Sequence, residues 1–560
     1  MGAGRVTLRR LGVVAGIALA GYGLWRLLTL SSDGGVHETR PPAIVSGVLS
    51  RGNGAEPDSL DPQLARMDSA LTILRDSYEG LTSLSRDARV LPGAAESWSV
   101  ADDGRRYTFR LRPDARWSNG EAVTAEDFAF AWRRLVDPRT ASQYAALLEP
   151  VQNAAAIARG RQPAATLGVR ALDAATLEVQ LTRPTAHFPA LLSHPATFPV
   201  HRPTLAAHPR DFARPGVAVT NGAYRPAEWQ VGSHVVARRN PHYRVRAAID
   251  VVRYEHITDA AAELRRYRAG DLDVTYTIPP GQVGRLRSQL GGEVRTGVQL
   301  GTYYYGLAVD REPFRDAKAL RQALAMVIDR ALLTERLLGG GERPAHAWVP
   351  PGVDGYRGAE FDWARLSWPR RLETARRLYA AAGYSAARPL RITLRYNKSP
   401  LHDDLAIAIA AMWRQHLGVD TRLHPEEYRA LKQAIDNREA QVFRASWIGD
   451  YNDATSFLQV LQSGFGINLP RYANPAYDAL LARAGETLDG AARVDLLREA
   501  EALLLDDVPL IPIYFYATQH LVKPRVQGWY DNVMNVTYTK DLAIITTGQV
   551  GPPPSAGVKP

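Results

Sequence analysis

The stretch R-R-Y-T-F-R-L-R, residues 105–112, decides the fold class of this chain. Its apolar residues, Tyr107 and Phe109 among them, alternate with polar ones, which is the pattern of a strand with one buried face. The same alternation returns in T-L-E-V-Q-L, residues 176–181, and in L-R-I-T-L-R-Y, residues 390–396. Strands are therefore expected far apart along the chain.

Helical patterns alternate with these strands, because apolar residues recur at the spacing of one helix face. Three helices are expected: residues 320–328 after a cap at Asp316, residues 491–505 after a cap at Asp489, and residues 375–382 with Gly383 in a left-handed C-terminal position. Since strands and helices interleave over the whole body, the predicted class is mixed α/β.

Charge and cysteine content exclude several classes of protein. The chain has 560 residues, with 68 Lys and Arg against 58 Asp and Glu. The basic residues are scattered, with no basic run of five or more and no nucleic-acid motif, so their excess does not indicate a nucleic-acid-binding protein. Cysteine is absent, which excludes a disulfide framework, a thiolate metal site, a cysteine nucleophile and a lipid-anchored cysteine.

Residues 1–40 have the composition of a targeting segment followed by a linker. A basic start with Arg9 and Arg10 precedes the stretch 11–30, which is apolar apart from Arg26. This layout predicts either a cleaved export signal or a membrane anchor of about 20 residues. With either alternative the body of the protein lies outside the cytoplasm. The Gly- and Pro-rich residues 548–560 predict a disordered tail.

Common catalytic motifs are missing from the chain. H-E-x-x-H, G-x-x-x-x-G-K-[ST] and G-x-S-x-G do not occur, and the glycine run 339–341 lacks the Lys-Ser/Thr of a phosphate loop. His187, His194 and His201 share a seven-residue spacing, but the prolines among them prevent a continuous helix that would align them. We therefore expect satisfied or surface histidines, and a binding protein without metal or cofactor rather than an enzyme.

Many short motifs occur in the order typical of one family of solute receptors. They include E-P-D-S-L-D-P (56–62), Y-E-G-L (78–81), P-G-A-A-E-S-W (92–98), W-S-N-G-E-A-V-T-A-E-D-F (117–128), T-N-G-A-Y (220–224), T-Y-Y-Y (302–305), R-E-P-F-R-D-A-K-A-L-R-Q-A-L (311–324), A-S-W-I-G-D-Y-N (445–452) and V-P-L-I-P-I-Y-F-Y (508–516). From about residue 50 to 545, the chain resembles the peptide/oligopeptide/nickel-binding family that feeds ATP-driven importers, family 5 of the solute-binding proteins. It is most similar to the oligopeptide- and murein-peptide-binding members.

The resemblance implies a two-lobed fold of the periplasmic-binding-protein type II-like class, with an additional third domain and a ligand cleft between the lobes. Lobe I would take residues 41–79, 204–300 and 518–547, the extra domain residues 80–203, and lobe II residues 301–517. The lobes would close by a hinge motion around the ligand.

The implied function is the capture of short peptides in the periplasm for an ABC importer, whose permease subunits would be the partners of a monomeric receptor. Two alternatives stay open. One is a receptor specific for murein peptides, and the other is a membrane-tethered peptide sensor without a role in transport.

The resemblance also implies which residues bind the peptide ends. Charged ends need opposite charges, since an unpaired charge in a closed cleft costs several kcal/mol. Asp450 matches the family's amine-binding aspartate, and Gly449 before it leaves room for close backbone approach. Arg444 and His402 match positions that meet the peptide carboxylate directly or through water. The alternatives are a turn aspartate, a structural salt bridge for Arg444 and a solvated loop for His402.

Several further residues fall where the family lines its side-chain pockets. They are Tyr144, Tyr304, Tyr428, Trp447 and Asn397. Aromatic walls provide apolar contact, while a hydroxyl or a water molecule adapts to different side chains. Packing in the hydrophobic core is the alternative for each of these residues.

The chain departs from the family pattern in three respects. A family lysine that serves the carboxylates of longer peptides corresponds to Leu338. A cysteine pair of close relatives corresponds to Gly301 and Ile448, and an acidic residue near the amine corresponds to Arg66, with Asp68 close by. These departures bear on peptide length and on the preference for basic residues.

Overall fold

The computed structural model of the chain describes residues 47–545. The expected signal or anchor at residues 11–30 and the expected tail at residues 548–560 lie outside this range. Within residues 47–545, no helix is both long enough and apolar enough to cross a membrane.

Sheet I has four strands in the order β1 (Val48–Gly52), β10 (Val251–Glu255), β9 (His234–Arg239) and β8 (Tyr224–Gln230). Strand β1 pairs parallel with β10, and the other pairs are antiparallel. The associated helices are α2 (Asp68–Ser77), α7 (Ala260–Ala269) and α8 (Val283–Leu290). The short pair β17 (Val526–Gln527) and β18 (Ala543–Ile544) contributes apolar side chains to the core of this sheet.

Sheet II is antiparallel, in the order β4 (Ala95–Val100), β5 (Arg106–Leu111), β7 (Thr176–Gln180) and β6 (Val169–Ala171). A smaller hairpin of β2 (Thr82–Leu84) and β3 (Val90–Pro92) precedes it. The helices associated with sheet II are α3 (Ala125–Val136), α4 (Ala154–Ala158), α5 (Phe188–Leu191) and α6 (Arg202–Ala207). A capping box of Thr124 and Asp127 starts α3, the helix that covers the sheet with Phe128 and Trp132.

Sheet III has six strands, in the order β12 (Arg343–Pro344), β16 (Leu510–Leu521), β11 (Val294–Leu307), β15 (Val442–Ile448), β13 (Arg391–Asn397) and β14 (Asp420–Glu426). Its helices are α9 (Lys318–Met326), α10 (Arg330–Leu332), α11 (Trp368–Ala381), α12 (Pro400–Leu417), α13 (Tyr428–Asp436), α14 (Thr455–Leu458), α15 (Pro475–Glu486) and α16 (Gly490–Asp507).

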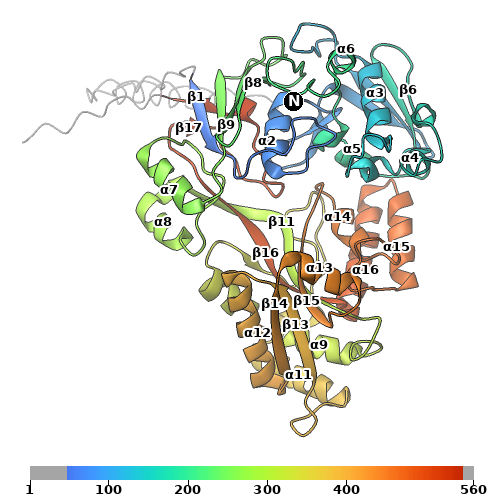
Figure 1. Cartoon of the computed structure of the whole chain (residues 1–560). Coiled ribbons are helices and arrows are strands. Elements are labelled where there is room, and N and C mark those ends of the chain that lie inside the picture. The colour runs from blue at the N-terminus through green and yellow to red at the C-terminus, as the bar shows by residue number, and fades with distance from the viewer. Residues whose placement is uncertain (1–46, 546–560) are drawn as a thin grey trace, which may run out of the picture. The chain divides into compact units, whose positions relative to one another are not determined.

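The long strands β11 and β16 link sheet III to sheet I, as Figure 1 shows. They pair antiparallel over most of their length, from Val294 opposite Leu521 to Gly306 opposite Leu510. Beyond β16, Val522 bridges to Val274, which in turn bridges to Arg51 of β1. Two strands therefore connect the two sheets, an arrangement that allows bending between them.

Each sheet has its own hydrophobic core. The core of sheet I includes Val252 and Tyr254, that of sheet II includes Phe109 and Trp132, and that of sheet III is the largest, running from Leu300 to Tyr514. Two segments cross this division. Ala70, Leu71 and Leu74 of α2, beside sheet I, are part of the core of sheet II, and so is Tyr451, which follows β15 of sheet III.

The secondary-structure predictions are confirmed except at one helix cap. The three predicted strands correspond to β5, β7 and β13, and the three predicted helices to α9, α11 and α16. Asp489 caps α16 by accepting from the Ala492 N–H at 2.8 Å, and Gly383 is left-handed with φ +85. The cap predicted at Asp316 is wrong. Asp316 has φ +54 and the cap position is Ala317, because Asp316 takes a left-handed turn conformation instead of the extended backbone of an N-cap.

Candidate functional site

Strand β15 and the loop after it carry Arg444, Trp447, Gly449 and Asp450. Antiparallel pairing with β11 places Ala445 opposite Tyr304 and Trp447 opposite Thr302. The strand lies inside sheet III between β11 and β13, so its position is fixed from both sides. The site residues on β15 therefore stand on a rigid element, and Asp450 stands just beyond its end.

Asp450 is a carboxylate without a cationic partner. Among residues 47–545, no salt bridge includes it, and its backbone N–H donates to Ser456 Oγ at 3.0 Å. Its side chain is reached by solvent and yet surrounded by protein, and this desolvation raises the pKa of Asp450 to about 6. A desolvated carboxylate without a partner is stabilised when a cation binds beside it.

Tyr144 approaches Asp450 from the loop after α3, in sheet II. Burial raises the pKa of Tyr144, and the negative charges of Asp450 and Asp68 raise it further. Asp68 is the exposed first residue of α2, beside sheet I. The charges of Asp450, which follows β15, and of Asp68, in α2, therefore both lie near enough to Tyr144 to act on its pKa.

Gly449 is buried, and the side chains packed around it leave no room for a Cβ atom. A Cβ atom at this position would lie 2.6 Å from Leu300 Cδ2 and 2.9 Å from Phe457 Cε2. The Gly449 N–H donates to the Leu300 carbonyl at 2.8 Å. The close approach at this glycine is therefore made by Leu300 and Phe457, and it fixes the start of the Asp450 loop against sheet III.

Arg444 is a guanidinium without a carboxylate partner in the described part of the chain. Its Nη1 donates to Asn397 Oδ1 at 3.2 Å and its Nη2 to the Tyr516 hydroxyl at 3.1 Å. Its Cζ lies 4.7 Å above the centre of the Tyr303 ring. Neutral groups hold Arg444 in place, so its positive charge is available to an anion.

His402 lies in the first turn of α12, close to Arg444. Its Nδ1 is 2.8 Å from the Asn397 carbonyl oxygen, which can only accept, so Nδ1 carries the proton. Burial and the charge of Arg444 lower the pKa of His402, so the ring is neutral at pH 7 and its Nε2 accepts. A neutral His402 meets a carboxylate through water, and only the protonated ring can donate to it directly.

The remaining predicted residues have different environments. Tyr304 is 2% exposed and packs edge-on against Trp348, with ring centres 5.1 Å apart, which is the environment of a core residue. Trp447 is half-buried and donates from Nε1 to the Ser456 carbonyl at 2.7 Å. Tyr428, at the start of α13, is 65% exposed. Trp447 and Tyr428 have accessible surface for a ligand, while Tyr304 is part of the core of sheet III.

The three departures also have structural explanations. Gly301 and Ile448 are cross-strand partners, and a Cβ on Gly301 would lie 2.4 Å from Ile448 Cδ1, so the isoleucine fills the place between them. Leu338 is 8% exposed and belongs to the core of sheet III. Arg66 is paired with Asp58 at 3.1 Å.

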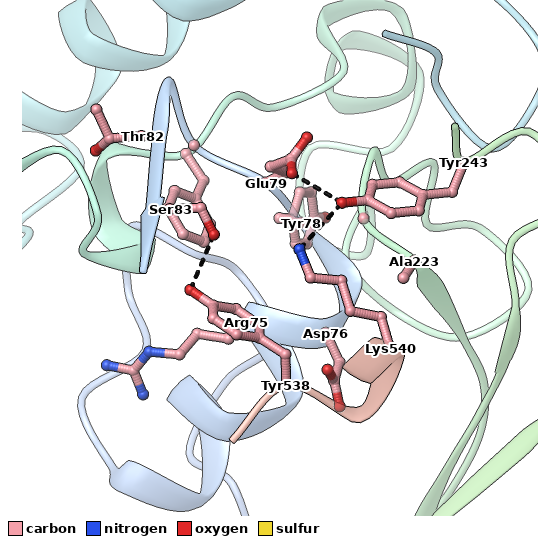
Figure 2. Close-up of a pocket in the computed structure, with 13 residues that line it drawn as sticks. Arg75, Asp76, Tyr78, Glu79, Thr82, Ser83, Ala223, Tyr243, Tyr538 and Lys540 are labelled. Carbon is pink, nitrogen blue, oxygen red and sulfur yellow. Dashed lines mark hydrogen bonds between the residues drawn. The ribbon is translucent and has the colours of Figure 1, made fainter. Parts of the chain in front are cut away.

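Three hollows of the structure lie away from the predicted site residues. Figure 2 shows a cavity of about 10 Å³, room for a single water molecule, where Ser83 donates to Tyr538 and where Tyr243 donates to Glu79 and accepts from Lys540. Surface hollows of about 610 Å³ over α15 and α16 and about 370 Å³ beside β16 lie elsewhere. None of the predicted site residues lines any of these three hollows.

The three histidines each have a structural contact. His194 Nδ1 accepts from the Ala196 N–H at 3.1 Å, and His201 Nε2 lies 2.7 Å from Glu121 Oε2. His187 stacks on Tyr451. No group of three or more His, Asp or Glu residues between residues 47 and 545 is arranged to hold a metal ion.

Sequence reasoning missed two residues that hold Arg444, namely Tyr303 and Tyr516. Both lie in motifs that the sequence made visible, T-Y-Y-Y and V-P-L-I-P-I-Y-F-Y. Their role depends on the pairing of β11 with β15 and β16, which brings three distant segments side by side. Strand alternation alone does not reveal such pairing.

Comparison with known proteins gives a consistent result. Residues 89–468 match the family model of bacterial extracellular solute-binding proteins, family 5 Middle. The chain is 37% identical over 503 residues to the periplasmic oligopeptide-binding protein OppA of Escherichia coli, which covers 89% of this chain and 92% of that protein. It is also 36% identical over 508 residues to the probable deoxycholate-binding periplasmic protein YgiS of Escherichia coli, covering 90% and 94%.

Solved structures extend the comparison to the fold. An MppA periplasmic murein tripeptide binding protein in its unliganded open form matches with a TM-score of 0.83 and 36% identity, over 90% of this chain and 99% of that one. The structure of the Escherichia coli murein tripeptide binding protein MppA matches with a TM-score of 0.75 and 37% identity, over the same shares.

Proposed function

This chain belongs to the bacterial extracellular solute-binding proteins of family 5, and on that premise we propose that it captures short peptides outside the cytoplasm for an ATP-driven importer. It has the two-lobed periplasmic-binding-protein fold of its structural relatives. The proposal concerns the ligand, the residues that hold it and the partner that receives it.

The observation that carries the proposal is a pair of opposite, unpaired charges on one strand and the loop that follows it. Arg444 has no carboxylate partner and Asp450 has no cationic partner among residues 47–545. A free peptide has an ammonium at one end and a carboxylate at the other. An ammonium at Asp450 and a carboxylate at Arg444 would satisfy both charges of the protein and both charges of the ligand.

The spacing of the two charges suits a short ligand. Asp450 follows Arg444 by six residues, and an extended chain rises about 3.3 Å per residue, so at most roughly 20 Å separates their Cα atoms. A peptide held at both ends would therefore contain no more than about six extended residues. Between the ends, Tyr428, Trp447 and Asn397 offer surface to side chains, with Tyr144 beside the amine.

The expected domains provide the cleft. We assign sheet I to lobe I (41–79, 204–300 and 518–547), sheet II to the extra domain (80–203) and sheet III to lobe II (301–517). Lobe II then carries Asp450 and Arg444, while the extra domain carries Tyr144. Bending at β11 and β16 would bring lobe I over the bound peptide.

Location and partners follow from the same premise. We propose a periplasmic receptor that acts as a monomer, uses no cofactor and delivers its peptide to permease subunits in the inner membrane. Sequencing the mature amino terminus decides whether residues 11–30 are removed. A start beyond about residue 20 argues for free diffusion, and an intact terminus for the membrane-tethered alternative.

Mass spectrometry of ligands released from the purified protein tests the proposed function most broadly. We expect a mixture of short peptides with free amino ends. Release of one chemically uniform peptide would instead support the murein-peptide alternative. A protein that releases no peptide and binds none from a defined library of tripeptides to hexapeptides contradicts the proposal.

The similarity to a probable deoxycholate-binding protein supplies a second candidate ligand class. Deoxycholate carries a carboxylate, which would suit Arg444, but it has no ammonium for Asp450. The unpaired Asp450 therefore favours peptides. Calorimetric titration of deoxycholate against a free-amine tripeptide separates the two classes, because replacing Asp450 by asparagine would weaken only the binding of the peptide.

A further inference from the structure

The loop that follows Asp450 is fastened to the core of sheet II. Tyr451 is 3% exposed and packs among residues of that core, although it follows β15 of sheet III directly. One face of its ring stacks on His187, with ring centres 5.5 Å apart and planes at 5°. The Tyr451 hydroxyl is 3.2 Å from Thr455 Oγ1, back in its own loop.

The next two residues fasten the loop on both sides. Asn452 Nδ2 donates to the Ala88 carbonyl at 2.9 Å, in the turn between β2 and β3, and Asn452 Oδ1 accepts from the Asp354 N–H at 3.3 Å. Asp453 is paired with Arg493 of α16 at 2.8 Å. Burial alone would raise the pKa of Asp453, but the Arg493 guanidinium lowers it to about 2, so the pair stays ionised.

The segment of sheet II around α5 supports two aromatic residues at the amine end. His187 lies just before α5 and stacks on Tyr451, and His194 lies just after α5 with its ring 4.3 Å from that of Tyr144. Burial lowers the pKa of His187 to about 4 and that of His194 to about 3, so both rings are neutral near pH 7. Two of the histidines that are spaced by seven residues thus pack against tyrosines, His187 against Tyr451 and His194 against Tyr144.

We infer that Tyr451 is a positioning residue for Asp450, inserted into the core of sheet II so that the amine-binding carboxylate is held at the junction with Tyr144. This inference rests on the proposed function. Asp450 itself makes one hydrogen bond through its backbone, to Ser456, and its side chain has no partner in the described residues. Its placement therefore depends on the residues on either side of it, Gly449 in sheet III and Tyr451 in sheet II.

The arrangement has a functional consequence. The contact between Tyr451 and the core of sheet II is part of the fold itself and uses no group of a ligand. The amine end of the site is then preassembled by two domains, which lowers the cost of ordering it on binding.

Calorimetric titration with a free-amine tripeptide and its N-acetylated form tests the role of Tyr451. For Tyr451→Ala we expect the affinity for the free-amine peptide to fall at least about tenfold, with little change for the acetylated one, because a charged interaction is misplaced. The pH at which amine binding is half lost should move from about 6 towards the ordinary aspartate value of about 3.9. Tyr451→Phe keeps the packing and should stay within about twofold of the parent protein.

Matched variants distinguish positioning from general destabilisation. Tyr379→Ala removes another buried tyrosine of sheet III, 4% exposed, and should lower the unfolding temperature without changing either titration. If Tyr451→Ala does not fold, Asn452→Ala removes the tie to Ala88 without a large cavity, and it should shift affinity and pH midpoint in the same direction. The inference is overturned if the folded variant, Tyr451→Ala or Asn452→Ala, prefers the free-amine peptide as strongly as the parent protein does and loses amine binding at the same pH. If Asp450→Asn also binds like the parent, the proposed function itself fails.

Discussion

The two ends of the proposed binding site are built in opposite ways. At the carboxylate end, Arg444 is already held by an amide, a phenol and an aromatic face, so its charge is partly satisfied without a ligand. At the amine end, the Asp450 side chain has no partner among residues 47–545, and desolvation raises its pKa. A ligand therefore gains more binding free energy at Asp450 than at Arg444. The protein should discriminate more strongly between free and blocked amino termini than between free and blocked carboxyl termini.

The difference also concerns rigidity. The carboxylate end lies within sheet III and the first turn of α12, so one domain contains it. The amine end joins a loop of sheet III to sheet II through Tyr451, and Tyr144 faces it from sheet II. Changes in domain position should affect the amine end first.

Removing the negative charge at the amine end should have the largest effect. For Asp450→Asn we expect a loss of at least ~2 kcal/mol, about thirtyfold, in calorimetric affinity for free-amine peptides. The protein should not become less stable. Because the folded-state pKa of Asp450 lies above its unfolded value, the ionised side chain opposes folding above about pH 6, and asparagine removes that cost. A variant that unfolds at a clearly lower temperature at pH 7 would contradict this account of the amine end.

Removing the positive charge at the carboxylate end should have a smaller effect. For Arg444→Gln we expect a loss of about tenfold in affinity for peptides with a free carboxylate, since neutral neighbours already share the charge. C-amidated peptides serve as the control, because the parent protein and the variant should bind them about equally. A loss larger than that of Asp450→Asn would reverse the comparison between the two ends.

Lowering the pH should weaken the amine end selectively. Binding of an ammonium requires ionised Asp450, whose pKa is raised to about 6, so affinity is retained above this pH and lost as the pH falls through it. Between pH 7 and pH 5 the affinity for a free-amine, C-amidated peptide should fall about tenfold. Titrations at constant ionic strength check this, with Asp450→Asn as the pH-insensitive control.

The smallest effect is expected at His402. Its lowered pKa leaves the ring neutral at pH 7, and a neutral ring that donates from Nδ1 reaches a carboxylate only through water. For His402→Gln we therefore expect a change below about threefold in affinity at pH 7. A loss above tenfold would show that the bound carboxylate protonates the histidine.

Local features of the fold could be predicted from the sequence, because they depend on neighbouring residues. The alternation in residues 105–112 predicts β5, and Asp489 caps α16 as expected. Asp316 was predicted wrongly as a cap, since its left-handed backbone is set by the turn around it rather than by its own propensity.

The site was predictable only in part. Arg444, Asn397 and His402 lie together in the structure, and their roles toward a peptide stay a prediction. The burial of Tyr304 and the need for glycine at 449 depend on packing against Trp348 and Leu300, which no sequence spacing reveals. Tyr451 is the extreme case, because its neighbours along the chain belong to sheet III and its packing neighbours belong to sheet II.

A calorimetric cycle tests the central claim most directly, with the parent protein and Asp450→Asn each titrated with one tripeptide in free-amine and N-acetylated form. We predict that acetylation weakens binding to the parent about thirtyfold and has little effect on the variant, a coupling of ~2 kcal/mol between carboxylate and ammonium. Equal affinity of the parent for both peptides, or the same effect of acetylation on both proteins, would contradict the assignment of Asp450 as the amine-binding residue.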